Sequence, residues 1–157
     1  MISDDWKKAV SQTSIPMVKE LALAVHKFYT KYPDDKKVSP LFISAQQGNL
    51  QLTQHLIGKG VDKNWNNANG LTPLFMAAKN GYLEVYRLIM EGVVDKNPAI
   101  NIGGTPLHVA AENGHYEICK LIMDNILDKN TATNYGATPL FMAALKVNKF
   151  SDLSLLL

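Results

Sequence analysis

The sequence predicts an all-α solenoid, a stack of one repeated helix-turn-helix unit. The stretch "GLTPLFMAAKNGYLEV" from Gly70 returns as "GGTPLHVAAENGHYEI" from Gly103 and as "GATPLFMAALKVNKFS" from Gly136. A fainter copy, "KVSPLFISAQQGNLQL", begins at Lys37. The prolines of the four copies lie 33 residues apart, at Pro40, Pro73, Pro106 and Pro139. A fixed period of this length indicates stacked structural repeats that share one continuous core.

The second copy shows why each unit should begin with a short helix. Thr72 is a favourable N-cap, because its hydroxyl can accept a hydrogen bond from a free N–H of the first turn. Pro73 fits the first helical position, where its missing N–H has no partner to lose. The small Ala77 and Ala78 allow neighbouring helices to approach closely. Gly81 supplies the left-handed residue that ends the helix.

A second helix should run from Tyr82 to about Met90, and a turn should follow it. The positions expected to be buried are Leu83, Val85, Leu88 and Ile89. The unit closes with the sequence Asp-Lys-Asn at 62–64, 95–97 and 128–130. A polar loop comes next, and its glycine stands two residues before each threonine, where a tight turn needs a positive φ. These glycines are Gly70, Gly103 and Gly136.

This order of elements, with "TPLHVAAENGHYEICKLI" from Thr105, resembles the ankyrin repeat family. The resemblance covers residues 33–157 and implies four repeats with protruding β-turn loops. Their approximate bounds are 33–64, 65–97, 98–130 and a truncated 131–157. The family's histidine, which ties neighbouring loops together, survives only as His108. Phenylalanine replaces it in the other units, and Val147 replaces the glycine in the middle of the fourth unit.

The two ends of the chain depart from the repeat. Residues 1–32 are expected to form an N-terminal helical cap, because apolar residues recur there at helical spacing. These residues are Val18, Leu21, Ala22, Val25, Phe28 and Tyr32. An independent partner-binding helix anchored by Trp6 is the alternative. At the other end, "SDLSLLL" stops inside the fourth unit's second helix, so we expect the front part of a longer protein. Its uncovered last repeat should fray or self-associate.

Composition limits the kinds of partner and the cellular location that are expected. The chain has 157 residues, 19% of them charged, and a net charge of +2, which argues against nucleic acid as the partner. No segment reaches the roughly 18–20 apolar residues that a membrane helix needs, so membrane insertion is not expected. The single cysteine favours a reducing, cytoplasmic location, with a nuclear protein or an exported effector left open.

No catalytic residue, metal site or cofactor is expected. Cys119 occupies the second-helix position held by Thr53 and Tyr86 in other units, which explains it without a reactive thiolate. His115 lies four residues before Cys119, but a zinc site needs two further ligands and no second pair follows. His55 should be a packed residue at the edge of the core. The asparagines of Asp-Lys-Asn should bond loop backbone through their side chains.

The resemblance implies a non-enzymatic module that binds a partner protein through a concave surface of turns and first helices. The candidate binding residues on the turns are Trp65, Asn69, Leu71, Ile100, Ile102 and Tyr135. Those on the first helices are Lys79, Glu112, Asn113, Leu145 and Lys146. Trp65 and Ile102 could instead pack on neighbouring turns and stiffen the stack. The alternative function is the regulatory or targeting arm of a larger enzyme, channel or ubiquitin-ligase adaptor.

Overall fold

The computed structural model describes residues 39–150, in which short helices alternate with extended loops and no strand occurs. The helices form three pairs and a single longer helix. The pairs are α3 (Pro40–Gln47) with α4 (Leu50–Gly58), α5 (Pro73–Asn80) with α6 (Leu83–Met90), and α7 (Pro106–Asn113) with α8 (Tyr116–Met123). Helix α9 (Pro139–Phe150) follows. The predicted all-α fold of paired helices is confirmed, whereas the expected cap at 1–32 lies outside the described residues.

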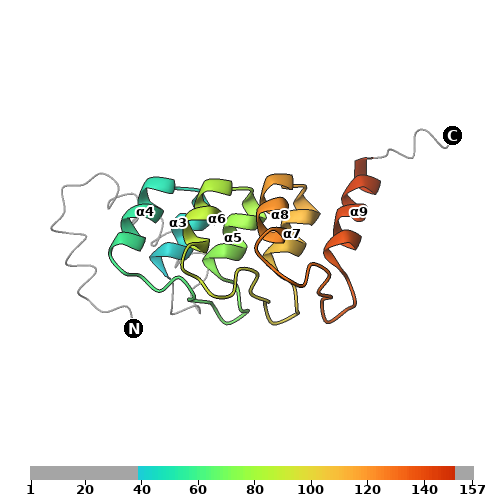
Figure 1. The fold of residues 1–157 in the computed structure, drawn as a ribbon, viewed down its shortest axis with the longest axis horizontal. Coiled ribbons are helices and arrows are strands. Elements are labelled where there is room, and N and C mark those ends of the chain that lie inside the picture. The colour runs from blue at the N-terminus through green and yellow to red at the C-terminus, as the bar shows by residue number, and fades with distance from the viewer. Residues whose placement is uncertain (1–38, 151–157) are drawn as a thin grey trace.

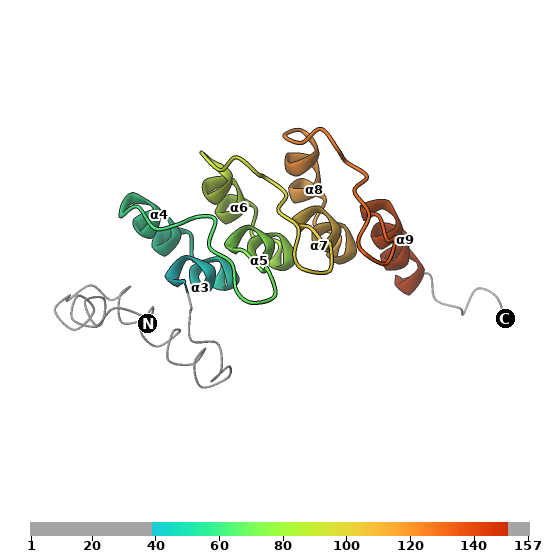
Figure 2. The same ribbon diagram turned by 90° about the horizontal axis from the view of Figure 1, so that it is seen from below.

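The helices form two rows that run along the stack (Figures 1 and 2). Helices α3, α5, α7 and α9 contact one another in order, and α4, α6 and α8 do the same beside them. The close approach within the first row depends on small side chains, since Ala77, Ala78 and Ala110 are completely buried. Loops join each pair to the next and protrude along one side of the molecule (Figure 1).

The start and end of the first helices follow the sequence prediction. The Thr72 hydroxyl accepts a hydrogen bond from the Phe75 N–H at 3.1 Å, so the threonine caps α5. Gly81 ends the same helix with φ +79°, in the left-handed region that glycine tolerates without strain. Equivalent glycines with positive φ end α3 and α7.

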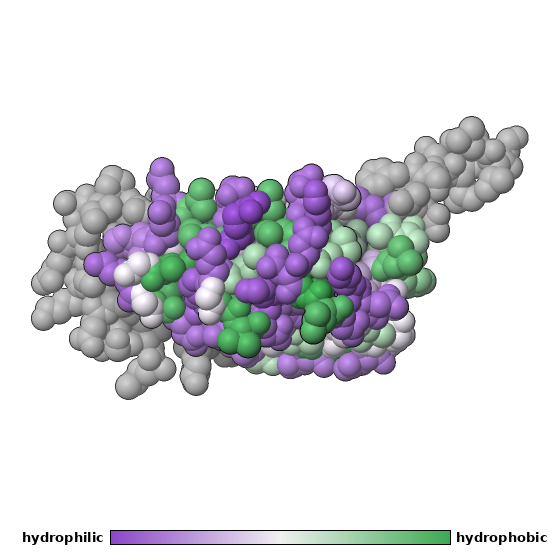
Figure 3. All heavy atoms as spheres, viewed as in Figure 1, coloured by the Kyte–Doolittle hydropathy of each residue, from purple (hydrophilic) through white to green (hydrophobic). Residues whose placement is uncertain are grey.

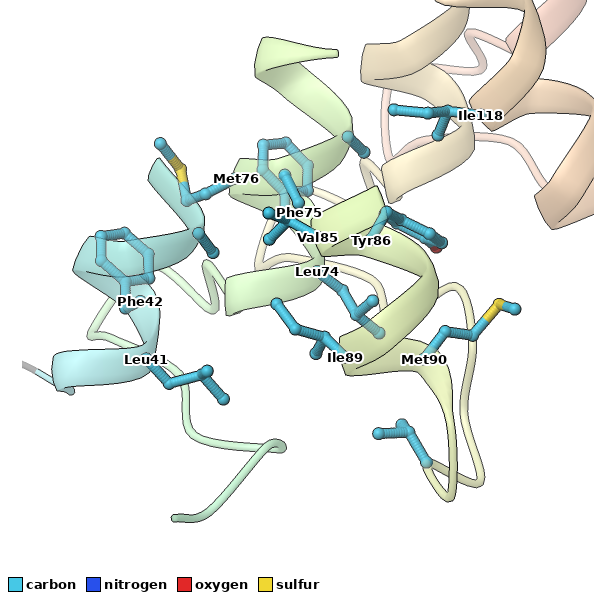
Figure 4. Packing of buried hydrophobic residues seen from close by; sticks show 14 of the residues in the cluster. Leu41, Phe42, Leu74, Phe75, Met76, Val85, Tyr86, Ile89, Met90 and Ile118 are labelled. Carbon is cyan, nitrogen blue, oxygen red and sulfur yellow. The ribbon is translucent and has the colours of Figure 1, made fainter. Parts of the chain in front are cut away.

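The core lies between the two rows and continues from one repeat to the next (Figure 4). Leu74, Tyr86 and Ile89 are its completely buried centre in the second unit. Tyr86 keeps its hydroxyl paired by donating a hydrogen bond to the Lys96 carbonyl oxygen at 2.6 Å. Each large apolar side chain buried in this way stabilises the fold by roughly 1.5–3 kcal/mol, so the stack is held by its inter-repeat contacts.

The expectation that His55 packs at the core edge is wrong, because its side chain is exposed. Helix α4 buries Leu52, Thr53 and Leu56. His55 precedes Leu56 by one residue and is therefore turned about 100° away from it around the helix. That direction leads to solvent, even though Leu88 and Leu121 are partly buried at the equivalent positions of α6 and α8.

Helix α9 is longer than the other first helices because Val147 stands where they have Gly48, Gly81 and Gly114. A β-branched residue rarely adopts a left-handed conformation, so the backbone continues as a helix to Phe150. The expected second helix of the fourth unit would therefore have to begin after Phe150, outside the described residues.

Candidate partner-binding surface

Each protruding loop carries a β-turn closed by its own backbone. In the loop before α7, the Gly103 N–H donates to the Ile100 oxygen and the Ile100 N–H donates to the Gly104 oxygen, both at 2.8 Å. The same pair of bonds recurs at 67–71 and at 133–137. Gly70, Gly103 and Gly136 all have φ near +79°, which confirms the predicted turn glycines.

Asparagine side chains link each turn to the turn before it. Asn101 donates its side-chain N–H to the Ala68 oxygen at 2.8 Å and its backbone N–H to the Asn69 oxygen at 3.1 Å. Asn134 makes the equivalent bonds to Asn101 and Ile102. This linkage was not predicted from the sequence. Their spacing of 33 residues is the signal that could have revealed it.

The turn glycines also make room for these asparagines. A Cβ on Gly70 would lie 2.9 Å from Asn101 Oδ1, and a Cβ on Gly103 would lie 2.8 Å from Asn134 Oδ1. Glycine is therefore required at each position for two reasons. The backbone adopts a positive φ, and the side chain of the neighbouring asparagine leaves no room for a Cβ.

His108 connects the turn at 100–104, through Thr105, to the turn at 133–137, as the resemblance implies. Its Nε2 lies 3.0 Å from the Ala137 carbonyl oxygen, which can only accept, so Nε2 carries the proton. Nδ1 then accepts a hydrogen bond from the Thr105 N–H at 3.2 Å. Both ring nitrogens of this buried histidine are paired, which stiffens the base of the turns.

Ile102 and Tyr135 are the most exposed apolar candidates on the turns. They occupy the same position of adjacent turns, and Asn69 stands there in the turn before. The exposed fraction is 49% for Ile102 and 83% for Tyr135. Since the Ile102 oxygen accepts the Asn134 N–H at 3.0 Å, the two turns lie side by side. Large apolar groups held in solvent by hydrogen-bonded turns are suited to contact a partner.

Trp65, Leu71 and Ile100 lie deeper than the tips. All three are partly buried and pack against the core. The Trp65 ring meets Phe42 edge to face, with ring centroids 5.4 Å apart and an interplanar angle of 68°. For Trp65, the geometry supports the alternative in which the side chain stiffens the stack.

The first-helix candidates divide in a similar way. Lys79, Glu112 and Leu145 are exposed. Asn113 is half-buried and donates its side-chain N–H to the Val109 oxygen at 2.8 Å. The half-buried Lys146 reaches from α9 to the Asn113 carbonyl oxygen. The last two candidates therefore take part in contacts that hold the helices in place.

His115, which directly precedes α8, and Cys119 within α8 make structural contacts. His115 donates from Nε2 to the Lys79 carbonyl oxygen at 3.1 Å, and its ring covers Gly81. Cys119 is half-buried, and burial raises the pKa of its thiol, which opposes formation of a reactive thiolate. Over residues 39–150, no cluster of three or more metal-ligating side chains occurs.

The family model described as "Ankyrin repeats (3 copies)" matches the chain over residues 7–99 and again over 85–157. Together with the helix pairs and turns, this match shows that the chain belongs to the ankyrin repeat family. Ankyrin repeats are typically non-catalytic and generally mediate protein–protein interaction. No curated protein matches the chain. Within the part that the structure describes, no helix has both the length and the apolar character to span a membrane.

Proposed function

We propose that the chain is a non-enzymatic adaptor that binds a partner protein through its turn tips and the exposed face of its first helices. The observation that carries the proposal is that equivalent positions of the repeated backbone carry different exposed side chains. One position of successive turns presents Asn69, Ile102 and Tyr135. Variation on a regular frame allows a stack of similar units to be specific for one partner.

Rigidity supports this function. The turns are joined to one another by the bonds of Asn101 and Asn134, and to the helices by His108. Side chains on such a frame lose little conformational freedom on binding, so more of the contact energy contributes to affinity. Figure 3 shows the opposite side of the stack, that of the second helices, where hydrophobic and polar residues are intermixed.

The test is affinity capture with mass spectrometry, using the wild type and the double variant Ile102→Ala, Tyr135→Ala. The matched control is Val94→Ala, Leu127→Ala, because these aliphatic side chains are also exposed but follow the second helices. The first pair should lose a partner that the wild type and the control retain. Equal recovery by all three baits would refute the assignment of the turn tips.

The second candidate is the regulatory or targeting arm of a larger enzyme, channel or ubiquitin-ligase adaptor. It uses the same binding surface and differs in what the surface recruits. The full-length reading frame distinguishes this arm from a separate adaptor. The single cysteine supports a location inside the cell for either candidate.

A further inference from the structure

The sequence contains three Asn-Gly pairs, at 69–70, 80–81 and 113–114. In such a pair the asparagine side chain is prone to attack by the backbone nitrogen of the next residue, because glycine has no Cβ to block the approach. The second and third pairs end α5 and α7. The first lies in the turn before α5, which protrudes from the helices (Figure 1). One chain therefore presents the same reactive pair in two different surroundings.

At the two helix ends, hydrogen bonds hold both of the groups that would react. Asn80 donates its side-chain N–H to the Gln46 oxygen at 3.1 Å, and Asn113 donates its own to the Val109 oxygen at 2.8 Å. The backbone N–H of the glycine that follows each asparagine is shared between two carbonyl oxygens of its own helix. The side-chain amide and the attacking nitrogen are therefore both kept in place.

In the turn, the same two groups are held less firmly. The Asn69 side chain is exposed and makes no hydrogen bond to any residue of the described range 39–150. The Gly70 N–H has one acceptor, the Asn67 oxygen at 2.9 Å. Attack at this pair requires that single bond to open, whereas attack at a helix end requires the side-chain bond and both backbone bonds to open. Fewer bonds to break means a more frequent opening of the reactive geometry.

We propose that Asn69 is the asparagine that the folded chain converts spontaneously to aspartate and isoaspartate. The Gly70 nitrogen loses its proton and attacks Asn69 Cγ. The N–Cγ bond forms, the Cγ–Nδ2 bond breaks, and the side-chain nitrogen leaves as ammonia with a proton in place of the one lost. Water then opens the cyclic succinimide. Cleavage of the new N–Cγ bond gives aspartate, and cleavage of the original peptide bond gives isoaspartate, so that water is the one co-reactant.

Either product changes the junction between two linked turns. The Asn69 carbonyl oxygen accepts the Asn101 N–H at 3.1 Å, and Asn101 Oδ1 lies 2.9 Å from where a Cβ on Gly70 would be. In isoaspartate the main chain gains a methylene group and this carbonyl becomes part of a pendant carboxylate, so the turn loses the geometry of that bond. Both products also place a negative charge at the turn position that holds Ile102 and Tyr135 in later repeats. The reaction proceeds whether or not these tips bind a partner.

The test incubates the full chain at pH 8, with and without guanidinium chloride, and follows the three pairs by tryptic peptide mapping with mass spectrometry. The three asparagines fall in separate tryptic peptides. In the folded chain, Asn69 should deamidate at least about fivefold faster than Asn80 or Asn113, since each additional hydrogen bond slows the opening. In the denaturant the three rates should converge, because all three pairs are then unstructured. Equal rates in the folded chain, or a faster reaction at a helix end, would overturn the proposal.

Two variants and a second readout test the route and its effect. Asn69→Gln should abolish the reaction at this site, because glutamine would have to form a larger ring, whereas the matched change Asn80→Gln should leave the Asn69 rate unchanged. Aged wild-type chain should exchange the Asn101 N–H faster than fresh chain, and aged Asn69→Gln should not. Unchanged exchange after deamidation would refute the effect on the turns. Aspartate without isoaspartate at this site would refute the succinimide route.

Discussion

Replacing Tyr86 by Phe removes one hydroxyl from the centre of the stack and leaves the ring in place. The side chain is completely buried, and its hydroxyl donates to the Lys96 carbonyl oxygen at 2.6 Å. This bond joins the second helix to the Asp-Lys-Asn turn that closes the repeat. The variant therefore measures how firmly the turn is held by the core.

The expected loss of stability at neutral pH is about 1–2 kcal/mol. A buried hydrogen bond contributes about 0.5–1.5 kcal/mol net, and an acceptor that loses its donor inside the protein costs somewhat more. The loss of stability should lie at the lower end of what an unpaired buried acceptor costs, because Lys96 is only half-buried and water can reach part of its backbone. For a chain of this size, such a loss lowers Tm by roughly 2–8 °C.

The pH dependence gives a second, independent readout. Burial, and then the nearby charge of Asp95, raise the pKa of Tyr86 far above its ordinary value of 10.0. Since the folded state resists ionisation of this phenol, the stability it contributes is complete below pH 10 and is lost as the pH rises above 10. Between pH 9 and pH 11, Tyr86 alone should remove about 1.4 kcal/mol from the free energy of unfolding. The difference in free energy of unfolding between the wild type and Tyr86→Phe should decrease by that amount.

Urea unfolding followed by circular dichroism at pH 7, 9 and 11 measures both effects. Tyr82→Phe is the matched control, because Tyr82 is exposed and lies at the start of the same helix. The control should match the wild type in stability at pH 7. If Tyr86→Phe unfolds at the wild-type urea concentration at pH 7, or if the gap stays constant up to pH 11, the account of a buried, paired phenol is refuted.

The remaining predictions concern one turn, one thiol and one helix. Asn97→Ala should lower Tm by roughly 2–4 °C, because the Asn97 side chain accepts a hydrogen bond from the Leu107 N–H at 2.9 Å. Asn130→Ala, at the exposed equivalent position, should leave Tm unchanged. Because burial raises the pKa of the Cys119 thiol, its alkylation by iodoacetamide should accelerate at a higher pH in the folded chain than in urea; coincident pH profiles would contradict this. Hydrogen exchange should be slowest in α5 to α8 and fastest in α9, because α9 contacts one neighbouring helix of its row. Equal protection of α9 and of α5 to α8 would contradict this.

The helices were predictable because each is specified locally. Thr72 and Gly81 mark the two ends of α5 through capping chemistry that depends only on neighbouring residues. The second-helix face was less clear from spacing alone. The completely buried Tyr86 was missing from the expected core, whereas Leu83 and Leu88, which were expected there, are only partly buried.

The binding surface could be predicted only in part, because exposure depends on contacts between repeats. The sequence places Trp65 and Ile102 on similar loops, yet Trp65 packs on Phe42 and Ile102 remains half-exposed. The linkage by Asn101 and Asn134 joins turns that are 33 residues apart, so reading one unit at a time cannot reveal it. Comparing equivalent positions between units is the step that would recover it.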